Sequence, residues 1–266
     1  MKQDFPVRPV TALVLAGSRG LPDPMAERAG VSHKALLPIA GIPMLIRVLN
    51  AIQPLRVEGH IGRIVVSTER PDMLDSLAAQ GFAVDDVEFL KASGSPSQSV
   101  AQALETLGAP LFVTTADHAL LKPEWIAYFL DSIPPQADIA VALAHAKLVM
   151  AAAPDTKRTF LRFHDGAFSG CNLFFLANPK AARAVTFWRH AEASRKHPIR
   201  LARLLGLHTM LRYALGLLTR NDVLNRLSRL TSAKAAFVDM PFGECAIDVD
   251  KAEDLELAER LAKARL

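Results

Sequence analysis

The sequence predicts an α/β protein, a three-layer α/β/α sandwich with a mostly parallel sheet. Three observations support this prediction. Four apolar runs have the continuous hydrophobic character of strands that are buried on both faces. Segments with helical patterns stand between those runs, as in a parallel sheet with crossover helices. Half of the 266 residues are hydrophobic, which is enough for a large core and excludes general disorder.

The first half of the chain contains these alternating elements. Helices are expected between and after the strands, and two of them begin at Pro71 and Pro123, a residue type favoured in the first turn. The expected strands are residues 10–16, 61–67, 111–113 and 139–144, and the expected helices are residues 43–53, 71–80, 97–107 and 123–132.

The second half departs from this alternation in a basic segment. Residues 180–234 contain twelve Lys and Arg but only Glu192 and Asp222 as acids, although the net charge of the whole chain is +4. We expect one domain over residues 1–266 with a basic helical insertion at about 179–233. The remaining expected elements are a loop and strand in 151–166, strands at 171–176 and 235–240, insertion helices at 179–196, 198–218 and 221–232, and a terminal helix at 251–266.

Composition also limits the compartment and the partners. Cys171 and Cys245 are too few for a disulfide framework or a four-ligand zinc site. No apolar run reaches the ~18 residues of a membrane helix, and the first run is short for a signal peptide. A cytoplasmic protein is expected. The sparse aromatics of the basic segment argue against nucleic acid as a partner.

The basic segment itself has three interpretations. Its arginines interleave with leucines between Arg200 and Arg220. Such a stretch can lie on the anionic inner face of a membrane, or it can form a lid that collects anionic substrates. It can also pack its leucines on the core and leave its arginines in solvent.

The candidate functional residues follow the predicted strands, because ligands of open α/β sheets bind at the carboxyl ends of the strands. The first strand ends in Leu15-Ala16-Gly17-Ser18-Arg19-Gly20, where small residues let backbone N–H groups approach a phosphate. An ordinary turn has the same composition. Lys34 strengthens the phosphate interpretation, because a lysine after such a loop can reach back and neutralise phosphate charge.

Aspartates at two places are candidate metal ligands. Asp117 follows the strand at 111–113, and Mg²⁺ prefers one or two carboxylates together with substrate phosphates. Asp248 and Asp250 would point the same way if their segment is extended. The alternatives are structural: Asp117 can serve a turn or a helix N-cap, and Asp250 can cap the last helix.

Four motifs in order resemble one family. The opening segment is Leu13–Gly20 followed by Lys34 and Leu37–Met44, and the second motif is Ser93–Leu104. The third is Thr115-Ala116-Asp117, and the fourth is Asp248–Leu255. Together they resemble the nucleotidyltransferases of the GT-A type, the group that includes the MobA-like NTP transferases. Two departures are clear: Ser18 stands where the family has its second glycine, and the loop of residues 21–33 is long.

The resemblance implies a function. The fold would be a Rossmann-like, GT-A type sheet, and the reaction would transfer a nucleotidyl group from CTP or GTP to a phosphorylated small-molecule or lipid-precursor acceptor, with release of pyrophosphate. Lys34, Asp117 and Arg19 would be catalytic, with Arg28 as the alternative to Arg19. Mg²⁺ would be bound by Asp117 and by Asp250 or Asp248. The nucleotide would contact Leu15, Ala16, Gly17, Ser18, Gly20, Ser93, Gly94 and Ser99. Its phosphates would meet the loop from Gly17 to Gly20, and its base would lie near Ser93, Gly94 and Ser99.

Two other functions remain open at this point. A glycosyltransferase of the same architecture would use a nucleotide-sugar, but it would place an Asp-X-Asp pair where Thr115-Ala116-Asp117-His118 has one aspartate. A catalytically silent nucleotide-binding or membrane-surface protein would fit the altered glycine loop. Lys34, Asp117 and Asp250 argue against it, because all three charged residues are present.

Overall fold

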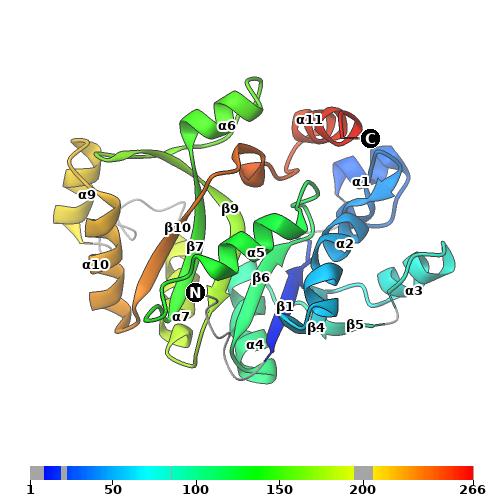
Figure 1. The fold of residues 1–266 in the computed structure, drawn as a ribbon, viewed down its shortest axis with the longest axis horizontal. Coiled ribbons are helices and arrows are strands. Elements are labelled where there is room, and N and C mark those ends of the chain that lie inside the picture. Colours follow the sequence, from blue (N-terminus) through cyan, green and yellow to red (C-terminus); the bar gives the residue numbers. More distant parts are fainter. Residues whose placement is uncertain (1–8, 19–22, 85, 195–205, 266) are drawn as a thin grey trace.

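The computed structural model describes residues 9–18, 23–84, 86–194 and 206–265. Its centre is an eight-stranded sheet with the strand order β10-β7-β9-β6-β1-β4-β5, and β8 pairs with β9 (Figure 1). In this sheet the pairings of β9 with β6, β7 and β8 are antiparallel and the other described pairings are parallel, so the predicted mostly parallel sheet is confirmed. The strands are β1 (Val10–Leu15), β4 (Ile61–Thr68), β5 (Val87–Lys91), β6 (Leu111–Thr115), β7 (Ile139–His145), β8 (Leu161–Phe163), β9 (Gly166–Leu176) and β10 (Ala235–Met240).

Helices cover both faces of this sheet. Successive residues of β1 point to opposite faces, so Ala12 and Val14 join one apolar core while Leu13 joins the other. The first core is completed by α2 (Met44–Val57), α3 (Asp72–Ala79), α5 (Pro123–Asp131) and α11 (Ala252–Lys263), and the second by α4 (Pro96–Leu107) and α7 (Ala181–Ser194). Burial on both faces explains the continuous apolar run of β1.

The remaining elements lie around these layers. β2 (Pro38–Ile39) and β3 (Ile42–Pro43) form a separate hairpin before α2. α9 (Leu207–Ala214) and α10 (Arg220–Thr231) lie at one end of the molecule, and α11 lies toward the other end with α1 (Pro24–Ala29) (Figure 1). α6 (Ala146–Ala152) contacts the short helix η2 (Gly243–Ala246), which leads from β10 toward α11.

Several predicted boundaries were wrong for identifiable reasons. α3 begins at Asp72, with Pro71 as its N-cap residue, and β9 begins at Gly166, five residues before the predicted strand. The predicted loop and strand at 151–166 contain the end of α6 and the short β8. β5 was missed because it is an edge strand with charged residues and without a buried residue. Part of the predicted helix at 198–218 lies outside the described residues, and α9 is its described part.

Gly243→Ala is expected to lower the free energy of unfolding by about 3 kcal/mol, because the new methyl group would overlap backbone. A Cβ atom at Gly243 would lie 2.0 Å from the carbonyl oxygen of Leu148 in α6. Urea denaturation measures the change. Gly170→Ala is the matched control, because a Cβ atom there meets nothing within 4 Å, and an equal loss in both variants would contradict the expectation.

Candidate functional site

A cleft of about 510 Å³ opens at the carboxyl ends of β1 and β6. Leu15, Ala16, Gly17 and Ser18 line it at the end of β1. Backbone hydrogen bonds tie this segment to both neighbouring strands: the Ala16 N–H donates to Ser67 at 2.8 Å, and the Ala116 N–H donates to Leu15 at 2.9 Å. The predicted phosphate-loop residues Arg19 and Gly20 lie outside the described residues.

Both hydrogen-bond donors of Ser18, its backbone N–H and its hydroxyl, bond to the Glu69 carboxylate. The Ser18 N–H donates to both oxygens of Glu69 at 3.2 and 3.1 Å, and the Ser18 hydroxyl donates to the same carboxylate. Burial opposes ionisation of Glu69, but the hydrogen bonds from Ser18 hold its pKa below the usual value. An anion of the protein therefore sits where the sequence predicts a phosphate of the ligand.

If the ligand is the nucleoside triphosphate that the sequence resemblance implies, Glu69→Gln is expected to lower its KM about fivefold. The substitution removes a negative charge beside the predicted phosphate position, a difference of about 1 kcal/mol in a solvent-exposed cleft. Steady-state kinetics measures KM, and Glu105→Gln on the exposed face of α4 is the control. A higher KM in Glu69→Gln would contradict competition and would make Glu69 a support for the loop.

The predicted base-contacting residues gather at a smaller cavity next to the cleft. Ser93, Gly94 and Ser99 line it together with residues of the β1 end, and its volume is about 40 Å³. The Ser93 N–H donates to the Ser99 hydroxyl at 2.9 Å, and the Ser93 hydroxyl donates to Gln102 at 2.6 Å. The loop before α4 is thus held in shape by its own side chains.

The basic segment contributes to the same cleft through α7. Trp188 and Glu192 line the cleft, and the Trp188 ring stacks on Phe174 of β9 with ring centroids 5.7 Å apart. The Glu192 carboxylate accepts hydrogen bonds from the hydroxyls of Ser95, at 3.0 Å, and Ser97. These contacts fasten α7 to the start of α4.

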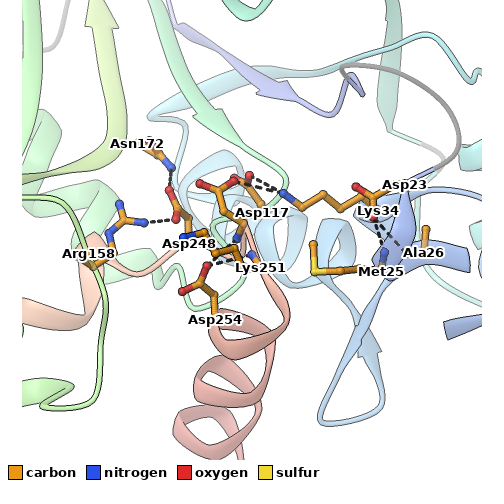
Figure 2. Close-up of polar contacts among 11 residues, drawn as sticks. Asp23, Met25, Ala26, Lys34, Asp117, Arg158, Asn172, Asp248, Lys251 and Asp254 are labelled. Atoms are coloured by element: carbon orange, nitrogen blue, oxygen red, sulfur yellow. Dashed lines mark hydrogen bonds and ion pairs between the residues drawn. The ribbon is translucent and has the colours of Figure 1, made fainter. Parts of the chain in front are cut away.

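Lys34 joins the two predicted groups of acidic residues. Its Nζ lies 3.4 Å from Asp117 Oδ2 (Figure 2). It also lies 3.4 Å from Asp250 Oδ1. Burial disfavours the charged ammonium, but Asp117 and Asp250 outweigh it and raise the pKa of Lys34. The backbone brings these residues together as well, because the Val249 N–H donates to the Asp117 carbonyl oxygen at 3.0 Å.

Asp248 lies beside this group but has other partners. Arg158 donates to one of its oxygens, and the Asn172 amide donates to the other at 2.6 Å (Figure 2). Burial raises the pKa of Asp248 to about 6, against the opposing effect of Arg158. The two carboxylates thus contact different residues, Asp248 with Arg158 and Asn172 and Asp250 with Lys34.

The cap of the last helix is made by another aspartate. Asp254 accepts hydrogen bonds from the backbone N–H groups of Asp250, at 3.1 Å, and Lys251, at 3.0 Å. Lys251 is the N-cap residue of α11, so the capping role that the sequence left open for Asp250 is not its role. The Asp250 carboxylate is free to face Lys34 and is 64% exposed.

A second cleft of about 290 Å³ adjoins the first. Asp248 and Asp250 line both clefts, so they lie at the junction. The second cleft adds cationic and hydroxyl groups from the segment before β8 and from β9, among them Lys157, Arg158, Thr159 and Ser169. The arrangement places two neighbouring ligand spaces around one pair of aspartates.

His118 lies under this site and does not line either cleft. Its ring is 1% exposed and stacks on Trp125 of α5, with ring centroids 6.3 Å apart. Burial lowers the pKa of His118 to about 3 from a usual value of 6.5. His118 is therefore a neutral core residue.

Acid is expected to destabilise the protein through His118. The unfolded chain takes up a proton near pH 6.5 while the folded ring stays neutral to about pH 3, so this contribution to stability is present above pH 6.5 and is lost as the pH falls. From pH 7 to pH 5 the contribution of His118 to the free energy of unfolding should drop by up to about 2 kcal/mol, while Asp248, with its pKa raised to about 6, contributes an opposing gain. Urea denaturation at both pH values tests this. An equal drop in His118→Phe would contradict the assignment.

Two site residues were missed from the sequence. Glu69 directly follows β4, so the strand-end rule that selected Gly17 and Asp117 would also have found it. Asn172 was not among the predicted site residues. It has φ +50° where the pairing of β7 with β9 shifts register, and such a bulge redirects a side chain toward a site. Asparagine tolerates this backbone conformation better than most residues.

Comparison with known proteins finds a matching family model and similar proteins. The family model of the MobA-like NTP transferase domain matches residues 12–234. A 3-deoxy-manno-octulosonate cytidylyltransferase of Bradyrhizobium sp. is 29% identical over 86% of this chain and 90% of its own length. One of Rhodopseudomonas palustris is 34% identical over 42% of this chain, and that match spans only 44% of the relative's length.

A solved structure resembles the whole fold. A hypothetical transferase from Thermus thermophilus is 33% identical and aligns with a TM-score of 0.78, over 93% of this chain and all of its own. No described helix is long and apolar enough to span a membrane.

Proposed function

Because the chain belongs to the MobA-like NTP transferase family and is a nucleotidyltransferase, we propose that it transfers a cytidylyl group from CTP to an anionic acceptor, with Mg²⁺ as its cofactor. One observation carries this proposal. Two clefts, one at the predicted phosphate loop and one that contains both cationic and acidic side chains, meet at Asp248 and Asp250. A donor and an acceptor bound in these clefts would have their reacting atoms side by side.

The donor would lie in the larger cleft. Its phosphates would meet the backbone at Gly17 and Ser18, and its base would lie near Ser93, Gly94 and Ser99. The cytidylyltransferase names of the relatives support CTP over the alternative, GTP. Lys34 would place its ammonium against the α-phosphate, where charge develops during transfer.

The acidic residues fit a bound Mg²⁺. Asp117 Oδ1 is buried and has no hydrogen-bond partner in the described part of the chain, while Asp250 faces the same space from the other side of Lys34. The described residues form no cluster of three or more His, Cys, Asp or Glu suited to a metal. Two carboxylates are nevertheless what Mg²⁺ requires when substrate phosphates complete its coordination. Bound there, Mg²⁺ would supply positive charge to the triphosphate.

Asp248 would have a positioning role. Its carboxylate binds Arg158, which lines the second cleft, and Asn172, which lines the larger cleft, and so orients one side chain in each. We therefore propose Asp117 and Asp250 as the Mg²⁺ ligands and assign Asp248 to the acceptor side. In-line attack by an acceptor oxygen on the α-phosphorus would form the new P–O bond and expel pyrophosphate.

The acceptor would be a small anion. Lys157, Arg158 and Lys251 line the second cleft and would attract a phosphate monoester, as the sequence predicts, or a carboxylate. The relatives are named for a sugar acid, 3-deoxy-manno-octulosonate, so sugar acids and sugar phosphates are both to be tested as acceptors.

Thermal denaturation with different nucleotides tests the donor. A ligand that binds only the folded state raises the melting temperature. CTP with Mg²⁺ should raise it more than GTP, UTP or ATP. A shift with UDP- or GDP-sugars alone would favour the glycosyltransferase. No shift with any nucleotide would favour the catalytically silent protein.

A further inference from the structure

The end of the molecule formed by α9 and α10 exposes a row of leucines. Leu207, Leu211 and Leu215 are 77%, 55% and 62% exposed, and Leu217 is 51% exposed. The first three are four residues apart, so they lie on one face of α9 and its last turn. These four residues are called the leucine patch. α9 contains no buried residue, which means that the described core does not use this helix.

The leucine patch is presented by a well-anchored scaffold. Arg212 forms an ion pair with Asp222 of α10 at 2.9 Å and donates to the Leu217 carbonyl oxygen at 2.9 Å. On the other side, the Tyr213 ring packs edge-on against Phe163 of β8, with ring centroids 6.2 Å apart. Leu218 is buried. The exposed leucines are therefore displayed outward by contacts that fix the helix in place.

A cationic cleft adjoins the leucine patch. It has a volume of about 370 Å³ and lies between α9 and α10, and Leu207 is part of its wall. Its polar lining consists of three arginines and one acid, together with Thr209, Asn225 and His208: Arg212, Arg226, Arg229 and Asp222. Residues 206–231 contain four arginines and one aspartate. The surface thus combines exposed apolar side chains with an excess of positive charge.

We propose that the leucine patch and the adjoining arginine cleft form a docking surface for an anionic lipid bilayer. Apolar side chains beside arginines are the composition of segments that lie in a membrane interface, with the apolar groups among the acyl chains and the cations at the lipid phosphates. The surface lies at the end of the molecule opposite α11 (Figure 1). This contact is independent of the donor and acceptor proposed above.

Two other occupants of this surface, a second copy of the chain and a nucleic acid, are less consistent with its side chains. A second copy of the chain on this surface would pair like with like across a two-fold axis and bring the arginines of both copies together. A single-stranded nucleic acid would need stacking platforms. The one aromatic residue of α9, Tyr213, is packed against Phe163.

Vesicle sedimentation with the full chain tests the proposal. Vesicles of phosphatidylcholine with about one third phosphatidylglycerol should bind the protein at least about tenfold more strongly than pure phosphatidylcholine. About 0.5 M salt should weaken the binding. Leu211→Ser with Leu215→Ser should reduce it at least about tenfold. Arg229→Gln should reduce it severalfold.

Two control variants and thermal melts show whether a loss of binding is specific to the leucine patch and the arginine cleft. Val57→Ser removes an 88% exposed apolar residue at the end of α2, and Lys147→Gln removes an exposed charge on α6; neither should change binding. Circular dichroism melts confirm that each variant folds. Absence of binding to anionic vesicles would overturn the proposal. So would equal binding by the double leucine variant, or a dimer in vesicle-free buffer that this variant dissociates.

Discussion

Asp117→Asn is expected to lower kcat/KM for nucleotidyl transfer about a thousandfold. The substitution keeps the shape of the side chain but removes the charge that we propose for Mg²⁺ binding. Asp117 Oδ2 contacts Lys34, and Oδ1 is buried without a partner in the described residues, so the carboxylate is poised for a ligand that the chain itself does not supply. The additional rise in melting temperature that Mg²⁺ gives to the CTP complex should disappear.

The control for Asp117→Asn is an aspartate away from the site. Asp131 ends α5 and is exposed, so Asp131→Asn should leave kinetics and melting temperature unchanged. Retention of more than about a tenth of the activity by Asp117→Asn would remove Asp117 from the proposed metal site.

Lys34→Met is expected to lower kcat about a hundredfold with a smaller change in KM. The ammonium is the positive charge of the chain between Asp117 and Asp250, and its raised pKa keeps it protonated through neutral pH. Charge that develops on the α-phosphate during transfer is stabilised mainly in the transition state, so kcat carries most of the loss.

A conservative variant separates the charge of Lys34 from its geometry. Lys34→Arg keeps the positive charge but places a larger planar group between the two aspartates, and it should restore only part of the activity. Lys147→Met on α6 is the control for the loss of an exposed lysine. A loss in Lys34→Met that falls on KM alone would contradict a role in transfer.

The elements of the sheet could be predicted because their signals are local. Residues 10–16 and 235–240 were predicted as strands from their own composition, and the structure has β1 at Val10–Leu15 and β10 at Ala235–Met240. β5 could not be predicted in this way. Its residues are half-buried or exposed, and its pairing with β4 fixes it as a strand only in the folded molecule.

The site residues whose positions depend only on the order of the strands could be predicted. Gly17 and Asp117 follow adjacent parallel strands, so their meeting follows from the sheet. The different partners of Asp248 and Asp250, Arg158 and Lys34, are far from them in the sequence, and no local pattern indicates these contacts. The Glu69 contact with Ser18 also spans two strand ends, and it coincides with the position where serine replaces the family glycine.

The most direct test of the proposed nucleotidyl transfer follows the α- and γ-phosphates of CTP separately. CTP labelled at the α-phosphate and CTP labelled at the γ-phosphate would each be incubated with the protein, Mg²⁺ and a mixture of sugar acids and sugar phosphates. Nucleotidyl transfer predicts that the α-label enters an acceptor-dependent product and the γ-label enters pyrophosphate. A γ-label recovered on the acceptor, or an α-label recovered only as free CMP, would contradict the account.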